Sequence, residues 1–541
     1  MTTMNQVRIK YLSSILSLLF TGIGATQAGD FFDPDGVRGT LIIVGGGSVP
    51  EEVPHAIKNA VGDGSLIILS EASSDPKASA ESAKKWLSGN GIPNPIIIDA
   101  MLPVPQRQSQ TCAAIESANV VWIGGGQQSL LAERFAGSGV EAALRSLLQR
   151  GGTVAGTSAG AAIMSKVMIA SGQDNPHLSL GWDLLPGGIV DQHFTERNRL
   201  RRTQIAVEKH PECFGLGVDE ATAVFVSGRG MKIVGKGGVS ITLAKTAYRN
   251  AEVLRLSAGQ YADLTQLRRA ARQRTLGIDP GEPTSGLPQT KSGSLVIVGG
   301  GGMPKEIVNR FIELAGGKQA RIVVLPTAVS RDDTTNEIPG FLKREDVAEI
   351  TVLTQRGSEV NTDDFRSTLK SATGIWFGGG RQWNFVDCYE GTEAIELFHD
   401  VLHRGGVIGG SSAGATIQGE FLVRGHPLGN TVMMAEGYER GFSFLPGVAI
   451  DQHFAQRGRF PDLLPVIRRH PRLLGIGIDE ATAIVVTGSK AEVIGQNAAH
   501  FISDKQLTKI PAGEDLPMTA DAAAKLYISV KSGETVDLTF P

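Results

Sequence analysis

The sequence predicts an α/β protein made of two tandem copies of one domain, each with a mostly parallel sheet covered by helices on both faces. Continuous apolar runs end in glycine or other small residues, as in TLIIVGGG, SLIILSEAS, NVVWIGGG and GTVAGTSAG. Helix-like stretches such as 140–150 separate these runs. Strands that are apolar on both faces and alternate with helices are typical of parallel sheets. Ligands of such sheets bind beyond the C-terminal strand ends, where the glycine-rich blocks lie.

A tandem duplication is visible in five sequence blocks. Three blocks recur at the same offset: LIIVGGG at 41 and 295, VWIGGGQQ at 121 and IWFGGGRQ at 375, and GGTVAGTSAGA at 151 and GGVIGGSSAGA at 405, so that 295 − 41 = 375 − 121 = 405 − 151 = 254. Two further blocks, DQHF at 191 and 451 and GLGVDEATA at 215 with GIGIDEATA at 475, recur at an offset of 260 residues.

The repeat sets the expected domain bounds. We expect a signal peptide at 1–28, a first domain at 29–276, an exposed Pro/Gly/Ser/Thr-rich linker at 277–292 and a second domain with a C-terminal extension at 293–541.

Composition excludes two classes of protein. Of 541 residues 41% are hydrophobic, which a disordered chain lacks, and Lys+Arg 52 against Asp+Glu 55 leaves a net charge of −3, without the basic excess of a nucleic-acid binder. Glycine is frequent, at 68 residues. We expect no nucleic-acid partner.

The N-terminus has the pattern of a secretory signal peptide. Arg8 and Lys10 precede an apolar stretch at 11–25, and small residues flank a cleavage position after Ala28. Cleavage there removes two basic residues and leaves 50 − 55 = −5. The alternative, a membrane anchor, is disfavoured because the stretch is shorter than the roughly 20 residues that a spanning helix needs. We expect export to the periplasm or beyond, and no membrane partner.

Cysteine usage is sparse for an exported chain. Cys112, Cys213 and Cys388 cannot form a disulfide scaffold, and at least one thiol is left unpaired. No Cys/His cluster has the spacing of a zinc site, so we expect no metal.

The glycine-rich turn after the first strand resembles a dinucleotide-binding fingerprint only in part. Gly45 and Gly47 are followed by Pro50 where the third glycine is required, and the second copy departs in the same way. The turn is better explained as a tight strand-to-loop connection that exposes backbone N–H groups to a site.

The block around Ser158 fits G-x-S-x-G, in which small neighbours let a strained turn lift a nucleophilic serine above the sheet. Ser412 repeats it. His193 and His453, in the DQHF blocks, are the candidate bases. Spacing leaves the carboxylate open among Asp191, Asp219 and Glu220 in the first copy and Asp451, Asp479 and Glu480 in the second. The order serine, histidine, acid disfavours the α/β-hydrolases.

GTSAGA, DQHF with spaced arginines, and G-x-G-x-D-E-x-T-A together resemble the cyanophycinase family of serine exopeptidases, which includes aspartyl dipeptidase. The resemblance implies a flavodoxin-like fold akin to class I glutamine amidotransferase domains. It also implies hydrolysis of cyanophycin, multi-L-arginyl-poly-L-aspartate, to β-Asp-Arg dipeptides without a cofactor. The nucleophile, base and acid it implies are Ser158, His193 and Glu220 in the first copy and Ser412, His453 and Glu480 in the second.

The resemblance also implies substrate-binding residues. They are Gln128, Asp191, Gln192, Arg197, Arg199 and Arg202 in the first copy and Gln382, Asp451, Gln452, Arg457 and Arg459 in the second. We interpret the arginines as clamps for substrate carboxylates. Asp462 stands where the third arginine of the second copy is expected, which puts substrate binding there in doubt.

We expect the oxyanion hole to use backbone N–H groups of Gly46 and Ala159, and of Gly300 and Ala413. The two halves are expected to pack as an internal pseudo-dimer. Two alternatives remain: an isoaspartyl or α-aspartyl dipeptidase with the same triad, and a peptide-binding protein in which one or both sites are silent.

Overall fold

The computed structural model of the chain describes residues 32–276, 279, 281–284, 286–343, 346–510 and 515–539. The expected signal peptide at 1–28 lies outside these ranges, as do residues 277, 278, 280 and 285 of the expected linker. Within the described ranges no helix is long and apolar enough to cross a membrane. Cys112, Cys213 and Cys388 are free thiols.

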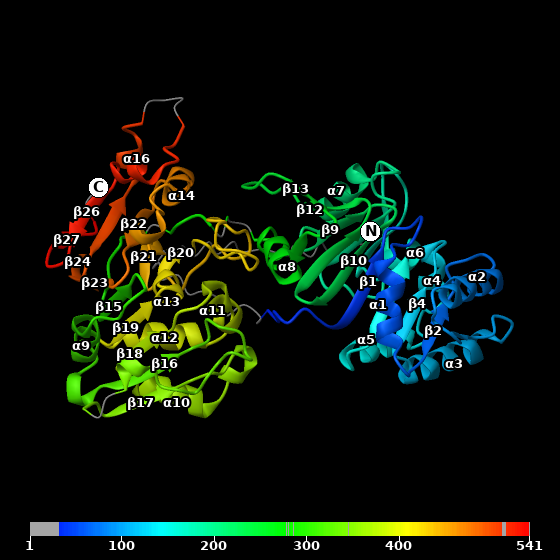
Figure 1. Cartoon of the computed structure of the whole chain (residues 1–541), viewed down its shortest axis with the longest axis horizontal. Coiled ribbons are helices and arrows are strands. Elements are labelled where there is room, and N and C mark those ends of the chain that lie inside the picture. The colour runs from blue at the N-terminus through cyan, green and yellow to red at the C-terminus, as the bar shows by residue number, and fades with distance from the viewer. Residues whose placement is uncertain are drawn as a thin grey trace, which may run out of the picture.

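The first half of the chain is built on an eight-stranded sheet of order β14-β11-β10-β1-β5-β4-β2-β3 (Figure 1). Strands β1, β5, β4, β2 and β3 pair in parallel, whereas β10, β11 and β14 extend the sheet antiparallel beyond β1. The bounds are β1 Val37–Val44, β2 Leu66–Leu69, β3 Ile96–Ile97, β4 Val120–Ile123, β5 Thr153–Thr157, β10 Thr222–Gly228, β11 Gly230–Gly235 and β14 Tyr261–Asp263. The predicted parallel sheet is present, with an antiparallel extension that the sequence patterns did not indicate.

A second, four-stranded sheet of order β13-β12-β9-β8 packs beside the first. Its strands are β8 Gly188–Gln192, β9 Phe214–Val218, β12 Gly238–Leu243 and β13 Glu252–Ser257, and a separate hairpin joins β6 Val167–Ser171 to β7 His177–Leu180. The helices are α1 Glu52–Val61, α2 Pro76–Gly89, α3 Val104–Ser117, α4 Gln128–Arg134, α5 Val140–Gln149, α6 Ala159–Ala162, α7 Leu200–Lys209 and α8 Leu264–Gln273.

Helices cover both faces of the large sheet because its central strands are apolar on both sides. Alternate residues of β1 enter different cores: Leu41 packs in the cluster that holds Leu144 of α5, and Ile42 in the cluster that holds Ile57 of α1. This is the burial pattern that a parallel strand requires. The predicted fold class is confirmed.

The second half repeats the architecture. Its large sheet has the order β17-β16-β18-β19-β15-β23-β24-β27, and its smaller sheet the order β20-β21-β22-β25-β26. The strands are β15 Ser294–Val298, β16 Arg321–Leu325, β17 Glu349–Val352, β18 Gly374–Phe377, β19 Val407–Ser411, β20 Gly419–Phe421, β21 Leu445–Gln452, β22 Leu474–Ile478, β23 Thr482–Thr487, β24 Lys490–Gly495, β25 Ala498–Ile502, β26 Ile528–Lys531 and β27 Thr535–Asp537.

The helices of the second half again lie between strands. They are α9 Lys305–Leu314, α10 Asp363–Ser371, α11 Gln382–Tyr389, α12 Ala394–His403, α13 Ala413–Thr416, α14 Leu463–Arg469, α15 Asp504–Leu507 and α16 Ala520–Ala524, with short 3-10 turns at Gly317–Gln319, Gly340–Leu342, Gly357–Val360 and Ala455–Arg457. The segment predicted as a C-terminal extension completes the two sheets: β26 pairs with β25, and β27 pairs with β24.

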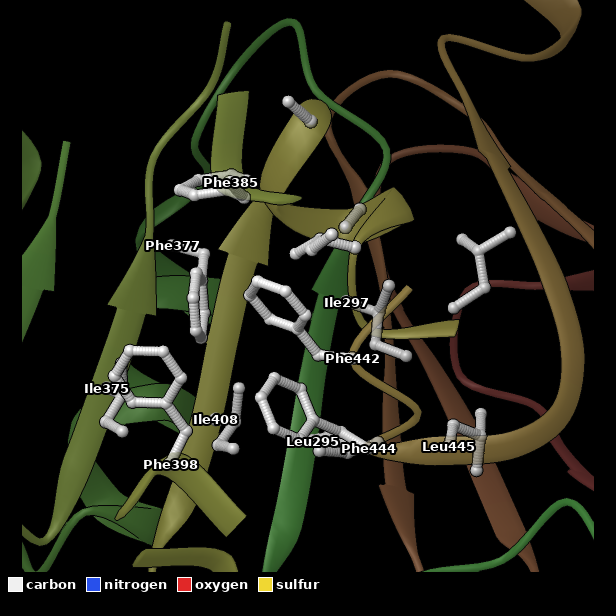
Figure 2. Packing of buried hydrophobic residues seen from close by; sticks show 14 of the residues in the cluster. Leu295, Ile297, Ile375, Phe377, Phe385, Phe398, Ile408, Phe442, Phe444 and Leu445 are labelled. Carbon is white, nitrogen blue, oxygen red and sulfur yellow. The ribbon is translucent and has the colours of Figure 1, made fainter. Parts of the chain in front are cut away.

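An aromatic core fills one face of the second large sheet (Figure 2). The ring of Phe377, on β18, lies 5.3 Å from those of Phe385 and Phe398, 5.9 Å from that of Phe442 and 5.7 Å from that of Phe444, all measured between centroids. Rings at these distances add to the stabilisation that burial provides. The core therefore fixes the strand ends that carry the glycine-rich loops.

The two halves contact each other through elements that are not equivalent. Helix α8 and the β10–β11 turn of the first half meet α11 and the 436–439 loop of the second (Figure 1). First-half arginines face second-half acids: Arg229 Nη1 lies 2.8 Å from Asp387 Oδ2, and Arg274 Nε lies 2.6 Å from Glu436 Oε1. A two-fold pseudo-dimer would pair the same surface of both halves. The described contacts are instead heterologous, so the expected pseudo-dimer is not what they form.

Candidate active site

The candidate nucleophiles stand on strained turns between a strand and a short helix. Ser158 follows β5 with φ 52° and ψ −110°, and Ser412 follows β19 with φ 56° and ψ −112°. A Cβ on Gly156 would lie 2.2 Å from the carbonyl oxygen of Gly160, so this turn needs its glycines. The G-x-S-x-G pattern thus forms the tight turn that the sequence predicted.

The structure brings Ser158, His193 and Glu220 together in one chain of hydrogen bonds. Ser158 Oγ lies 2.9 Å from His193 Nε2, and His193 Nδ1 lies 2.5 Å from Glu220 Oε1. Of the three carboxylates that spacing had left open in the first copy, only Glu220 contacts the imidazole.

The second half repeats this chain of hydrogen bonds. Ser412 Oγ lies 3.0 Å from His453 Nε2, and His453 Nδ1 lies 2.6 Å from Glu480 Oε1. The longer serine-to-histidine spacing of this copy therefore leaves the local geometry unchanged.

The site lies where the two sheets of a half meet, at the C-terminal ends of β1, β4, β5, β8 and β9. The N–H of His193 donates to the carbonyl of Gly45 at 2.7 Å, and the N–H of Ala221 donates to that of Gly46 at 3.0 Å, which joins the sheets at the site. His193 and Ala221 have φ of 49° and 52°, as strained as Ser158. Such backbone costs roughly 1–3 kcal/mol per residue and persists only where surrounding contacts hold it.

Glycines from two loops close around the three side chains. Gly46 packs against the His193 ring, since a Cβ there would lie 2.3 Å from Cε1, and Gly47 packs against Glu220. A Cβ on Gly125, which follows β4, would lie 3.4 Å from Ser158 Cβ. Gly46 and Gly300 were the loop glycines predicted to contribute N–H groups to the two oxyanion holes. Gly46 lies beside the His193 ring, and Gly300 lies in the same way beside the His453 ring. The glycine beside the nucleophile is Gly125, which was not among the residues expected to form the hole.

The environment of His453 favours a neutral imidazole. Burial is the largest effect and lowers its pKa below the ordinary 6.5; the hydrogen bond with Glu480 opposes this, and the positive charge of Arg457 adds to the lowering. A base must be unprotonated to accept a proton from serine. At a given pH, more of the His453 imidazole is therefore unprotonated than of an ordinary histidine.

Two of the arginines predicted to bind substrate carboxylates are buried and contact groups of the protein itself. Arg202 Nε donates to Asp191 Oδ2 at 2.8 Å, its Nη2 pairs with Oδ1, and its Nη1 donates to the carbonyl of Gly172 at 2.8 Å. Arg199 Nη1 binds the carbonyl and side-chain oxygens of Gln192 and reaches Asp191 at 3.4 Å. Asp191 has a fully buried side chain. Arg199 and Arg202 thus tie the start of α7 to β8, the strand that His193 follows, and the two guanidinium groups share the single carboxylate of Asp191.

The second half supplies the same buried ion pair from another position. Arg424 donates through Nε to Asp451 Oδ1 at 2.9 Å and through Nη2 to Oδ2 at 2.8 Å, and it also pairs with Asp462. Arg424 stands at the position that corresponds to Ala170, and Asp462 at the position that corresponds to Arg202. The second half thus has an arginine where the first half has an alanine, and an acid where the first half has an arginine. Arg424 therefore replaces the absent third arginine in the contact with the buried aspartate. Sequence reasoning missed Arg424 because no motif contains it.

The remaining predicted residues divide into buried and exposed ones. Gln128 and Gln382 are buried, and each donates its amide to a backbone carbonyl, of Ile169 and of Val423 respectively. Arg459 and Gln452 contact each other as Arg199 and Gln192 do. Arg197 and Arg457 are exposed beside the site, and within the described part of the chain neither forms an ion pair. They are the arginines free to meet a substrate carboxylate.

Among the described residues, no three His, Cys, Asp or Glu side chains gather in a way that could hold a metal ion.

Both halves of the chain are similar to known proteins. The family model for peptidase family S51 matches residues 51–234 and 295–494, one segment in each half. A cyanophycinase of Geminocystis herdmanii is 31% identical over 210 residues, covering 38% of this chain and 77% of its own length. One of Trichormus variabilis is 32% identical over 235 residues, covering 41% and 77%.

Among solved structures, a peptidase from an acI-B1 Actinobacterium matches with a TM-score of 0.34 at 19% identity, covering 42% of this chain and 98% of its own. The matched segments of the family model span more than half of the chain and include Ser158, His193, Glu220 and their counterparts. The chain belongs to peptidase family S51.

Proposed function

We propose that the protein is a serine exopeptidase that hydrolyses cyanophycin to β-Asp-Arg dipeptides. The observation that carries the proposal is the serine–histidine–glutamate chain of hydrogen bonds, present in both halves with distances that agree within 0.1 Å. Support for the substrate comes from relatives that are named cyanophycinases. The exposed Arg197 and Arg457 supply cationic groups for the carboxylates of a polyaspartate chain.

The proposed reaction is acyl transfer through the serine. His193 Nε2 takes the proton of Ser158 Oγ as that oxygen attacks the scissile aspartyl carbonyl, and Glu220 orients the imidazole and stabilises its cation. Collapse of the tetrahedral adduct breaks the C–N bond, and the imidazolium gives its proton to the leaving amine. A water, deprotonated by the same histidine, then releases the acyl group and restores the serine. General-base assistance of this kind contributes about 10²- to 10⁴-fold.

The oxyanion that forms in this step needs backbone donors. Ala159 is the first residue of α6, where N–H groups lack intrahelical acceptors, and Gly125 lies against the serine from β4. We assign the hole to the N–H groups of Ala159 and Gly125, and of Ala413 and Gly379 in the second half. Loss of one such donor costs about 10²- to 10³-fold in kcat.

The substrate assignment is tested by incubating the purified protein with insoluble cyanophycin and identifying soluble products by mass spectrometry. Release of β-Asp-Arg supports the proposal. Cleavage of Asp-X or isoaspartyl dipeptides with no release from the polymer would replace it with a dipeptidase of the same family.

Export is part of the proposal. The expected signal peptide predicts a mature protein that starts after Ala28 and acts outside the cytoplasm. N-terminal sequencing of the protein from cell fractions tests this, and a full-length cytoplasmic form would contradict it.

A further inference from the structure

A second buried carboxylate lies directly behind the catalytic groups of the first half. Asp219 precedes Glu220 and is 3% exposed. Its Oδ1 accepts from the N–H and the hydroxyl of Thr195, at 3.2 and 2.6 Å, and its Oδ2 accepts from the N–H of Gly238 at 3.0 Å. Thr195 lies two residues after His193. One carboxylate thus links the loop that carries the base to the loop that carries the acid.

The second half has the same link with other partners. Asp479 precedes Glu480 and is 5% exposed. It accepts from the N–H of Ala455 at 2.9 Å, two residues after His453, and from the N–H of Ala498 at 3.3 Å. The backbone connection is therefore preserved where the threonine hydroxyl is absent.

The basic partner of this carboxylate comes from opposite strands in the two halves. In the first, Arg255 on β13 pairs with Asp219, and Ser240 faces it across the ladder on β12. In the second, His500 on β25 lies 3.2 Å from Asp479, and Ser529 on β26 faces it. His500 occupies the place of Ser240, and Ser529 that of Arg255. Base and serine have changed places while the contact to the aspartate is kept.

The ionised form of Asp219 is favoured in this setting. Burial alone would raise its pKa, but hydrogen bonds from Arg255, Thr195 and Gly238 outweigh burial, and the pKa lies below its ordinary value. A buried charge is tolerated only when it is paired and fully hydrogen-bonded. This explains why each half retains a basic residue here even though its position differs.

We infer that Asp219 and Asp479, each held by its basic partner, are positioning residues that keep the histidine and glutamate of each site in hydrogen-bonding register. The inference rests on the proposed serine mechanism. The carboxylates act through the backbone of the two loops and do not contact the imidazole themselves.

The test measures how fast the serine reacts with a fluorophosphonate, which needs the histidine but no cyanophycin. Each site is studied alone, with Ser412→Ala as the parent for the first and Ser158→Ala for the second. In the first, Asp219→Asn keeps the size and removes the charge. Arg255→Ser removes the base, and Arg255→Ser with Ser240→His transplants the arrangement of the second half.

We expect Asp219→Asn and Arg255→Ser each to slow labelling about 10- to 100-fold while the final labelled fraction stays that of the parent. We expect the transplant to recover the parent rate to within about threefold. The reciprocal pair, His500→Ser with and without Ser529→Arg, gives the matched series in the second half.

Three results would overturn the inference: an unchanged labelling rate in Asp219→Asn, a transplant labelled no faster than Arg255→Ser alone, or a loss of labelling fully explained by a smaller labelled fraction, which would mean a role in stability only. Failure of the proposed substrate is distinguishable, because the parents would then be labelled normally yet release no β-Asp-Arg. Failure of the serine mechanism would leave the parents unlabelled.

Discussion

Replacing Glu220 by glutamine removes the negative charge that faces His193 Nδ1 and keeps a side chain of the same size. Two unit charges about 3 Å apart interact by roughly 1.5 kcal/mol in water and about 5 kcal/mol at an effective dielectric of 20. The Glu220 side chain is 37% exposed, so solvent screens it and the lower part of that range applies. A loss of about 2–3 kcal/mol of transition-state stabilisation corresponds to roughly 30- to 150-fold in kcat.

The assay is β-Asp-Arg release by Glu220→Gln in the Ser412→Ala background, where only the first site can react. We expect kcat to fall by that factor with KM little changed, because the imidazolium that forms in the reaction loses its counter-ion. Glu196→Gln is the matched control: its carboxylate only accepts the N–H of Glu220, and glutamine stands at that place in the second half. A kcat within threefold of the parent for Glu220→Gln would refute the assignment of the acid.

Three further predictions concern the second half and the contact between halves. Arg457→Gln should move the acid limb of the second site, measured in Ser158→Ala, to higher pH, because a positive charge that lowers the pKa of His453 is removed; an unmoved limb would contradict this. Arg424→Ala should destabilise the protein by about 1.5–3 kcal/mol in urea unfolding, since buried Asp451 loses its two-bond contact with Arg424 and, among the described residues, keeps only Arg459 as a charged partner, and adding Asp462→Arg should restore much of the loss; no recovery would count against the compensation. Asp387→Ala should cost about 1.5–3 kcal/mol, because Arg229 loses a charged hydrogen bond but keeps Asp263; unchanged unfolding would show that this contact contributes nothing.

The parts of the site that lie within short motifs were predictable from the sequence. A small-residue turn around a serine has one well-defined shape after a strand, so the neighbours of Ser158 and Ser412 in the sequence are enough to place them. Parallel strands that are buried on both faces have continuous apolar sequences, and the parallel part of each large sheet was predicted on that basis.

Residues whose partners are distant in the sequence were not predictable. Arg424, which follows β20, replaces Arg202 of helix α7, and His500 replaces Arg255 from the opposite strand of a ladder. Such swaps preserve a contact in space but leave no motif in the sequence. The heterologous contact between the halves was unpredictable for the same reason. Its residues come from α8, α11 and the 436–439 loop, which do not correspond to one another in the two copies of the repeat.

The assignment of Arg199 and Arg202 as substrate clamps shows the limit of a resemblance. Their spacing matched the family pattern, but spacing does not show whether side chains at the start of α7 face the substrate or the protein interior. In the structure both are buried and share the carboxylate of Asp191, whereas Arg197 and Arg457 are exposed. Burial, which decides between the two roles, follows only from the packing of α7 against β8.

The most direct test of the central claim compares cyanophycin hydrolysis by the wild type, Ser158→Ala, Ser412→Ala and the double variant. Because both halves hold the complete serine–histidine–glutamate geometry, each single variant should retain activity and the double variant should have none. A double variant as active as the wild type would contradict the serine mechanism outright, and a single variant without any activity would show that the other half is silent.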